Sequence, residues 1–146
     1  MSKKTFRKIL SANDVGATGG HQGGILVPKS ESELLSFLPS LDSAIKNPDA
    51  WIQCVDEVGN LRKFRFVYYN NRLHDAKGTR NEYRITHMTS YLREMVAEEG
   101  EILEISRNDR EERYSIRIIR DAAVPVEEET MERVRIKIKS AWRRVH

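Results

Sequence analysis

The sequence has few of the residues that cross-link small proteins, bind metals or anchor chains in membranes. Cys54 is the single cysteine among 146 residues, which excludes an internal disulfide and a cysteine-based zinc site. The four histidines show no metal-ligand spacing. No apolar run reaches the length of a membrane span, and none follows the charged N-terminus as a signal peptide requires. These absences predict a cytoplasmic protein without a metal, another cofactor or a membrane partner.

The composition predicts one soluble globular domain that covers residues 1–146. Hydrophobic residues make up 39% and charged residues 32%. The net charge of +3 is weak evidence for a nucleic-acid partner, and the distribution of charge along the chain is more informative. Seven Lys or Arg residues and two acidic residues lie between Arg62 and Arg84, whereas 98–104 and 127–132 are acidic. One basic face of this kind would orient a polyanion.

The stretch from Ser11 to Gln22 combines glycine with short polar side chains. Its glycines favour a loop over a strand or helix. No large apolar side chain in it would have to be buried. Its polar members are Asn13, Asp14, Thr18, His21 and Gln22. We therefore expect a loop that lies against a polar partner.

The remaining pattern predicts a mainly β protein with two short helices. Strands are expected at 6–10, 24–28, 51–58, 61–69, 102–106, 114–119 and 134–138, and helices at 30–39 and 89–98. Gly59-Asn60 is expected to form a two-residue hairpin turn. The aromatic residues Trp51, Phe64, Phe66 and Tyr68 occur at strand spacing and are expected in the core, although they could also stack on bases. Seven short strands indicate a barrel or a sandwich.

A second polar segment, 70–86, has the side chains that read base pairs. Arginine can donate two hydrogen bonds to guanine, asparagine pairs with adenine, and glutamate accepts from cytosine, each worth about 1 to 3 kcal/mol of discrimination. Arg80, Asn81, Glu82 and Arg84 supply this set, and in an extended chain Arg80, Glu82 and Arg84 share one face. The segment taken alone is equally well explained as a solvated Arg–Glu network.

Three stretches together resemble a known family. Ser11–Gln22, the run Tyr68-Tyr69-Asn70-Asn71-Arg72, and Thr79–Thr86 are similar to the N-terminal effector-binding domain of EcoRII-type restriction endonucleases. The resemblance covers the first two-thirds of the chain. It implies a seven-stranded DNA-binding pseudobarrel related to the domain of plant transcription factors.

The resemblance also implies two recognition arms, at 11–26 and 77–86, that enter the major groove of double-stranded DNA. It assigns base contacts to His21, Arg80, Glu82 and Arg84. We add Asn81 to the predicted base-reading residues because an asparagine amide can pair with adenine. At two positions where the family has lysine, this chain has Gly78 and Tyr83. Where the family has a tyrosine in the first arm, this chain has Leu26. Contacts to the DNA backbone or within the arms are predicted for Asn13, Asp14, Thr18, Gln22, Lys63, Arg65, Arg72, Lys77, Thr79 and Tyr83.

By the same resemblance, the domain is the effector or specificity module of a type II restriction endonuclease, and a separate nuclease domain cuts. The family's sites contain a CC or GG step, such as CC(A/T)GG. No catalytic residue is assigned here, and the setting would be prokaryotic and nucleoid-associated. Two alternatives remain: a small Mg²⁺-dependent nuclease built on Asp49, Asp75 and Lys77, and a protein-interaction barrel. Steep salt dependence of duplex binding would distinguish a groove binder from the latter.

Overall fold

The computed structural model describes residues 3–16, 24–120 and 142–145 of the chain. Eight strands and three short helices lie in these ranges. In chain order they are β1 (Lys3–Ile9), β2 (Ile25–Val27), α1 (Ser32–Phe37), β3 (Asp49–Val55), β4 (Leu61–Tyr69), α2 (Asn71–His74), β5 (Glu82–Thr86), α3 (Thr89–Glu94), β6 (Ile102–Asn108), β7 (Tyr114–Ile119) and β8 (Trp142–Val145).

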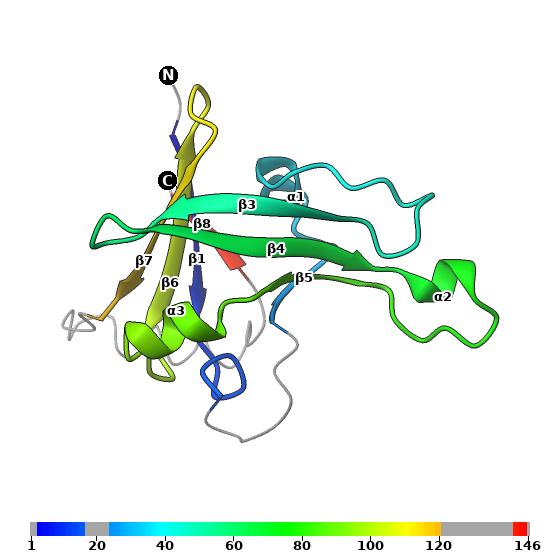
Figure 1. Cartoon of the computed structure of the whole chain (residues 1–146), viewed down its shortest axis with the longest axis horizontal. Coiled ribbons are helices and arrows are strands. Elements are labelled where there is room, and N and C mark those ends of the chain that lie inside the picture. Colours follow the sequence, from blue (N-terminus) through cyan, green and yellow to red (C-terminus); the bar gives the residue numbers. More distant parts are fainter. Residues whose placement is uncertain (1–2, 17–23, 121–141, 146) are drawn as a thin grey trace.

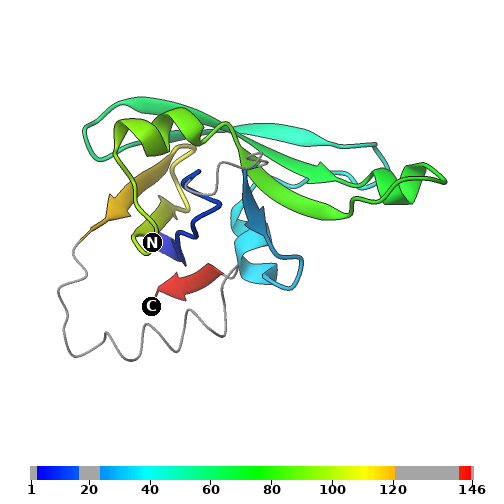
Figure 2. The same ribbon diagram turned by 90° about the horizontal axis from the view of Figure 1, so that it is seen from below.

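The eight strands form one strongly curved sheet in the order β2-β5-β4-β3-β7-β6-β1-β8. Neighbouring strands are antiparallel except β3 and β7, which are parallel. The sheet curls until its two edge strands approach each other (Figures 1 and 2). There the indole Nε1 of Trp142 in β8 donates to the carbonyl oxygen of Leu26 in β2 at 3.0 Å. The prediction of a mainly β, barrel-like fold is therefore confirmed.

The core fills the inside of this curled sheet. In β4, Phe64, Phe66 and Tyr68 all point inward and are buried, as their alternation predicted. Cys54 is fully buried, and burial raises the pKa of its thiol to about 12. It therefore behaves as the small hydrophobic residue that the sequence predicted. The prediction for Trp51 was wrong, because Ile52 and Cys54 take the inward positions of β3 and leave Trp51 54% exposed on the other face.

Several predicted boundaries differ from the structure. The β3–β4 connection is not a two-residue turn, because Asp56 accepts hydrogen bonds from the amides of Val58 and Asn60 and organises a longer loop. Helix α3 ends at Glu94, earlier than predicted, because Val96 adopts a positive φ of 51°. Helix α2 and strands β5 and β8 were not predicted. The strand expected at 134–138 lies outside the described residues.

Candidate nucleic-acid interface

The two predicted arms enter the β2–β5 strand pair from opposite ends. The first arm leaves β1 and returns through β2, and the second connects β4 to β5 through α2. Since β2 pairs with β5, the end of the first arm lies beside the end of the second. The α2 end of β4 and β5 projects away from the body of the molecule (Figure 1). Thr18, His21 and Gln22 of the first arm lie outside the described residues.

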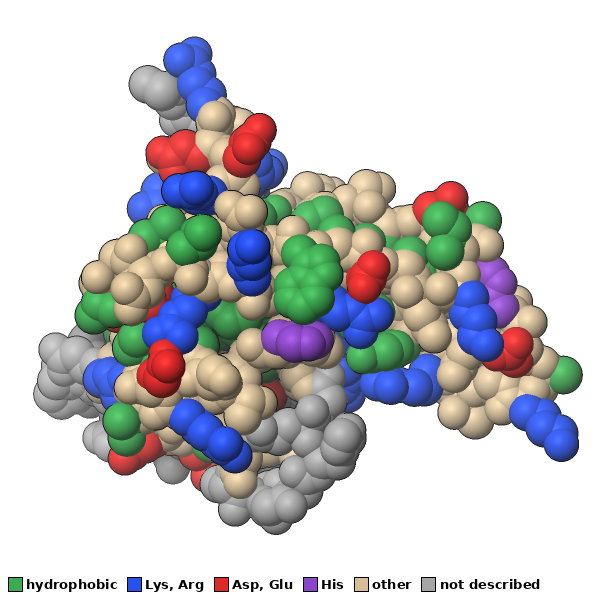
Figure 3. Space-filling model, viewed as in Figure 1, with side chains coloured by type: hydrophobic (Ala, Val, Ile, Leu, Met, Phe, Trp, Pro, Cys, Tyr) green, Lys and Arg blue, Asp and Glu red, His purple; other side chains and the backbone are tan. Residues whose placement is uncertain are grey.

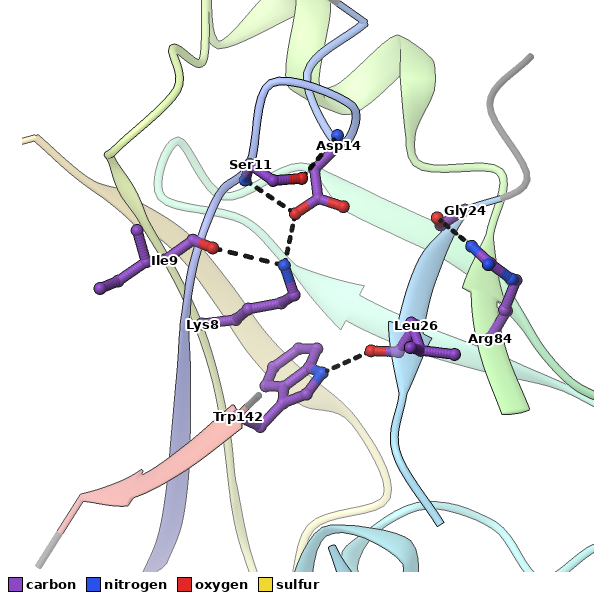
Figure 4. Close-up of polar contacts among 8 residues, drawn as sticks. All are labelled: Lys8, Ile9, Ser11, Asp14, Gly24, Leu26, Arg84 and Trp142. Carbon is purple, nitrogen blue, oxygen red and sulfur yellow. Dashed lines mark hydrogen bonds and ion pairs between the residues drawn. The ribbon is translucent and has the colours of Figure 1, made fainter. Parts of the chain in front are cut away.

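A buried ion pair holds the start of the first arm. The Nζ of Lys8 donates to the Oδ2 of Asp14 at 2.5 Å, and the two side chains are only 3% and 7% exposed. The same Oδ2 accepts from the amide of Ser11 at 2.9 Å, and the Ser11 hydroxyl accepts from the amide of Asp14 at 3.1 Å (Figure 4). The carboxylate of Asp14 therefore shapes the loop from within, whereas Asn13 lies exposed beside it.

The end of the first arm packs tightly against the second arm. Gly24 has a φ of +88°, and a Cβ atom there would lie 2.4 Å from the carbonyl oxygen of Ile85. Only glycine fits such a close backbone approach. One residue along β5, the Nη1 of Arg84 donates to the carbonyl oxygen of Gly24 at 3.0 Å (Figure 4). A predicted base-reading side chain thus ties the two arms together.

Local hydrogen bonds set the shape of the second arm. The Oδ1 of Asn71 accepts from the amide of Arg80 at 2.8 Å, and the amide of Arg72 donates to the carbonyl oxygen of Arg80 at 3.0 Å. A Cβ atom on Gly78 would lie 2.2 Å from the carbonyl oxygen of Asn71, so this position has no space for a lysine. The hydroxyl of Tyr68 donates to the Oδ1 of Asn81 at 2.5 Å.

The structure brings Arg80, Glu82 and Arg84 together in one charged group. The Glu82 carboxylate accepts from the Nε of Arg80 and from the Nε of Arg84, each at 3.1 Å. The Arg80 guanidinium also lies 3.8 Å from the centre of the Tyr69 ring. Partial burial opposes ionisation of Glu82, but the two arginines outweigh it and lower the pKa of the carboxyl group. The group is charged, partly exposed and held in a defined orientation.

The other predicted contact residues of β4 and the second arm differ in their surroundings. Lys63, Arg72, Lys77 and Thr79 are exposed. Arg65 forms an ion pair with Asp49 at 2.6 Å, and hydrogen bonding to Asp49 raises the pKa of Arg65. The ring of Tyr83, in contrast, stacks on Tyr68 at 4.2 Å between centroids, so that its aromatic face belongs to the edge of the core.

Sequence reasoning did not place two aromatic residues on the outer face of the sheet. Tyr69 lies under Arg80 on the outer face of β4, and Trp51 is exposed on the same face of β3. Figure 3 shows hydrophobic, basic and histidine side chains gathered over the middle of this face. The alternation of residues 61–69 could have predicted that Tyr69 lies on the outer face of the strand, since its neighbour Tyr68 lies on the inner face. Nothing in 51–58 distinguished the inner set of side chains from the outer one.

The carboxylates of the nuclease alternative do not form a metal site. Asp49 is paired with Arg65, and Asp75 is paired with the Nζ of Lys46 at 2.6 Å. Within the described ranges, no group of three or more His, Cys, Asp and Glu residues could hold a metal ion. Among those same residues, no helix is long and apolar enough to cross a membrane.

Comparisons with known proteins identify the family to which the chain belongs. Residues 1–111 match the family described as restriction endonuclease EcoRII, N-terminal. The chain belongs to this family. It is 42% identical over 89 residues to the type II restriction enzyme EcoRII of Escherichia coli, an alignment that covers 56% of this chain and 20% of that enzyme. The chain thus spans about a fifth of the length of this relative.

The fold is also similar to that of a solved plant protein. The Arabidopsis FUS3–DNA complex contains a chain that superposes with a TM-score of 0.57 and 18% sequence identity. The match covers 78% of this chain and 94% of that chain. At this level of identity, the similarity establishes a shared pseudobarrel fold.

Proposed function

We propose that this EcoRII N-terminal family domain binds a specific site in double-stranded DNA by placing its two arms in the major groove. The observation that carries the proposal is the group formed by Arg80, Glu82 and Arg84, which is fixed beside the first arm. Two arginines and a carboxylate on adjacent outward positions can read guanine and cytosine edges. Asn81 and His21 would add contacts from the second and the first arm. A fold shared with a plant protein solved in complex with DNA supports the proposal.

The internal contacts of this group suit a reading function. Tyr69 and the Gly24 carbonyl restrain the two arginines before DNA arrives. Restrained side chains lose less conformational entropy on binding, which favours affinity and discrimination. The exposed cations Lys63, Arg72 and Lys77, together with Arg65, would contact phosphates and set the register of the duplex. Asn13 and Asp14 would act by shaping the first arm.

The domain would act as the effector or specificity module of a type II restriction enzyme, with cutting left to a separate nuclease domain. A site that contains a CC or GG step, such as CC(A/T)GG, fits two arginines and a glutamate. Because Gly78 and Tyr83 stand where the family has lysines, the exact base sequence of the site would differ from that of the family. Such a module would meet its duplex at the nucleoid of a bacterial cytoplasm.

Selection from randomised duplex DNA tests the proposal directly. The purified chain, without added metal, should enrich a consensus sequence. Arg80→Ala should relax one base position, at a cost of about 1 to 3 kcal/mol, whereas Lys63→Ala should weaken binding to all sequences and reduce the salt dependence of binding. No enrichment over random duplex would refute specific binding.

A cleavage assay separates this proposal from the nuclease alternative. The purified chain should leave its selected duplex intact in Mg²⁺, because Asp49 and Asp75 are each neutralised by a cation. Cleavage that is lost in Asp75→Asn would establish the alternative instead. Asp75→Asn should not change duplex affinity.

A further inference from the structure

An exposed aromatic pair lies on the sheet face that carries Arg80, Glu82 and Arg84. The indole of Trp51 is 54% exposed, although β3 lies in the interior of the sheet. Its ring centroid lies 4.9 Å from that of the His87 imidazole, at an interplanar angle of 59°. Single exposed hydrophobic residues are common on proteins, so exposure by itself indicates nothing.

The histidine of this pair is held in an unusual conformation. His87 has a φ of +67°, which is uncommon for a residue other than glycine. Its Nδ1 lies 2.9 Å from the Oγ1 of Thr86, and its ring packs against Trp51. Such a conformation persists where the surroundings impose it, and it occurs often at functional sites. The pair is therefore a defined structure rather than two independent surface side chains.

The strand register places this pair next to the proposed DNA-reading group. Trp51 is opposite Arg65, and Arg65 is opposite Thr86, so these residues form one row across β3, β4 and β5. The adjacent outward row, which runs from Asp49 through Val67, contains Arg84. Arg84 contacts both Glu82 and the first arm. Trp51 therefore lies one outward row and two strands away from Arg84, where the two arms meet.

The charges around the pair suit a polyanion. Lys63 is exposed on the same outward face of β4, and Arg65 lies opposite Trp51. Asp49 is the acidic neighbour on β3, and Arg65 neutralises it. Lysine and arginine donate to phosphates, the indole N–H can donate as well, and an aromatic face packs on deoxyribose.

We propose that Trp51 and His87, together with Lys63 and Arg65, form a third contact surface that binds the sugar–phosphate backbone beside the base pairs held by the arms. This inference rests on the proposed function and adds residues outside both arms. The surface contributes affinity and alignment, not base discrimination, because backbone contacts carry no sequence information. Its loss should weaken binding to the selected site and to random duplex equally.

Fluorine NMR of protein labelled with 5-fluorotryptophan tests the inference in the unaltered chain. The sequence has two tryptophans, Trp51 exposed and Trp142 3% exposed, so two signals are expected. Trp51→Phe assigns the first signal. On adding the selected duplex, the Trp51 signal should move and lose its solvent-isotope shift, while the Trp142 signal keeps its position. A Trp51 signal that retains its position and isotope shift while the duplex is bound would overturn the inference.

Affinity measurements provide the second test. Trp51→Ala should weaken selected and random duplexes by the same factor, on the order of tenfold. Val58→Ala is the matched control, because Val58 is 66% exposed in the β3–β4 loop and should leave affinity unchanged. A Trp51→Ala variant with wild-type affinity, or one that alters the selected consensus, contradicts the inference. A wild-type chain that binds no duplex, with both fluorine signals unmoved, refutes the proposed function and this surface together.

Discussion

Lys8 and Asp14 form a salt bridge of 2.5 Å, buried where β1 enters the first arm. Burial of two charges has a large desolvation cost, and their pairing offsets it only while both partners are present. The pair therefore makes the start of the arm depend on the body of the sheet. Asp14 also accepts from the Ser11 amide, so one carboxylate joins the strand to its loop.

Removing the buried cation should destabilise the whole domain. Lys8→Met removes the Nζ donor from the buried Asp14 carboxylate, which should lower the free energy of unfolding by about 3 to 5 kcal/mol. Lys46→Met is the matched control: it breaks an exposed pair with Asp75 and should lower the free energy of unfolding by less than about 1 kcal/mol. Urea denaturation measures both. Equal losses in the two variants would show that the buried pair has no special role.

A methyl group on Gly24 should separate the arms. In Gly24→Ala the new Cβ atom would lie 2.4 Å from the Ile85 carbonyl oxygen, so β2 would have to move away from β5. Gly59→Ala is the control, since Gly59 has a similar φ of +86° but no atom within 4 Å of the place that its Cβ would take. Both variants carry the cost of a positive φ, roughly 1 to 2 kcal/mol. Gly24→Ala should therefore melt at a clearly lower temperature than Gly59→Ala. Equal melting temperatures for the two variants would contradict the predicted clash.

Alternation in the sequence was enough to predict strand β4 and the shared face of Arg80, Glu82 and Arg84. In β4 the inward residues Phe64, Phe66 and Tyr68 are large and aromatic, while Lys63 and Arg65 point outward. So strong a contrast fixes both the strand and its inner face. The outward set Arg80, Glu82 and Arg84 was predicted by the same rule, and its side chains do meet.

Features that depend on distant parts of the chain could not be predicted from local patterns. In β3 both faces carry apolar residues, so the sequence did not indicate that Trp51 points outward. Lys8 has the pattern of a surface lysine because its partner lies in an irregular loop. Strand β8 is four residues long and contains two arginines, and it is held by β1 and by the Trp142 contact to Leu26. Such contacts are properties of the tertiary structure.

Stability should depend on pH through Glu104, which lies between Arg7 and Arg117. Burial alone would raise its pKa, but hydrogen bonds from Arg117 and Arg7 outweigh burial and lower it. Because the carboxyl pKa is lower in the folded state, the contribution of Glu104 is complete above its unfolded-state pKa and is lost as pH falls through the folded-state pKa. Urea midpoints measured from neutral pH down through this range should fall less steeply for Glu104→Gln than for the wild type. Parallel curves for the two proteins would exclude this role.

Cys54 should report both the stability of the domain and its binding of DNA. Its thiol is fully buried with a pKa raised to about 12, so iodoacetamide can reach a reactive thiolate only when the domain opens. The alkylation rate should therefore follow the population of the open state. A selected duplex at about 100 times its dissociation constant should slow the reaction about a hundredfold, because it binds only the folded state. Random duplex of equal length should protect far less, and mass spectrometry of the single cysteine measures both rates. Alkylation of the native protein at the rate of an exposed thiol would contradict the burial of Cys54, whereas equal protection by both duplexes would show binding without sequence preference.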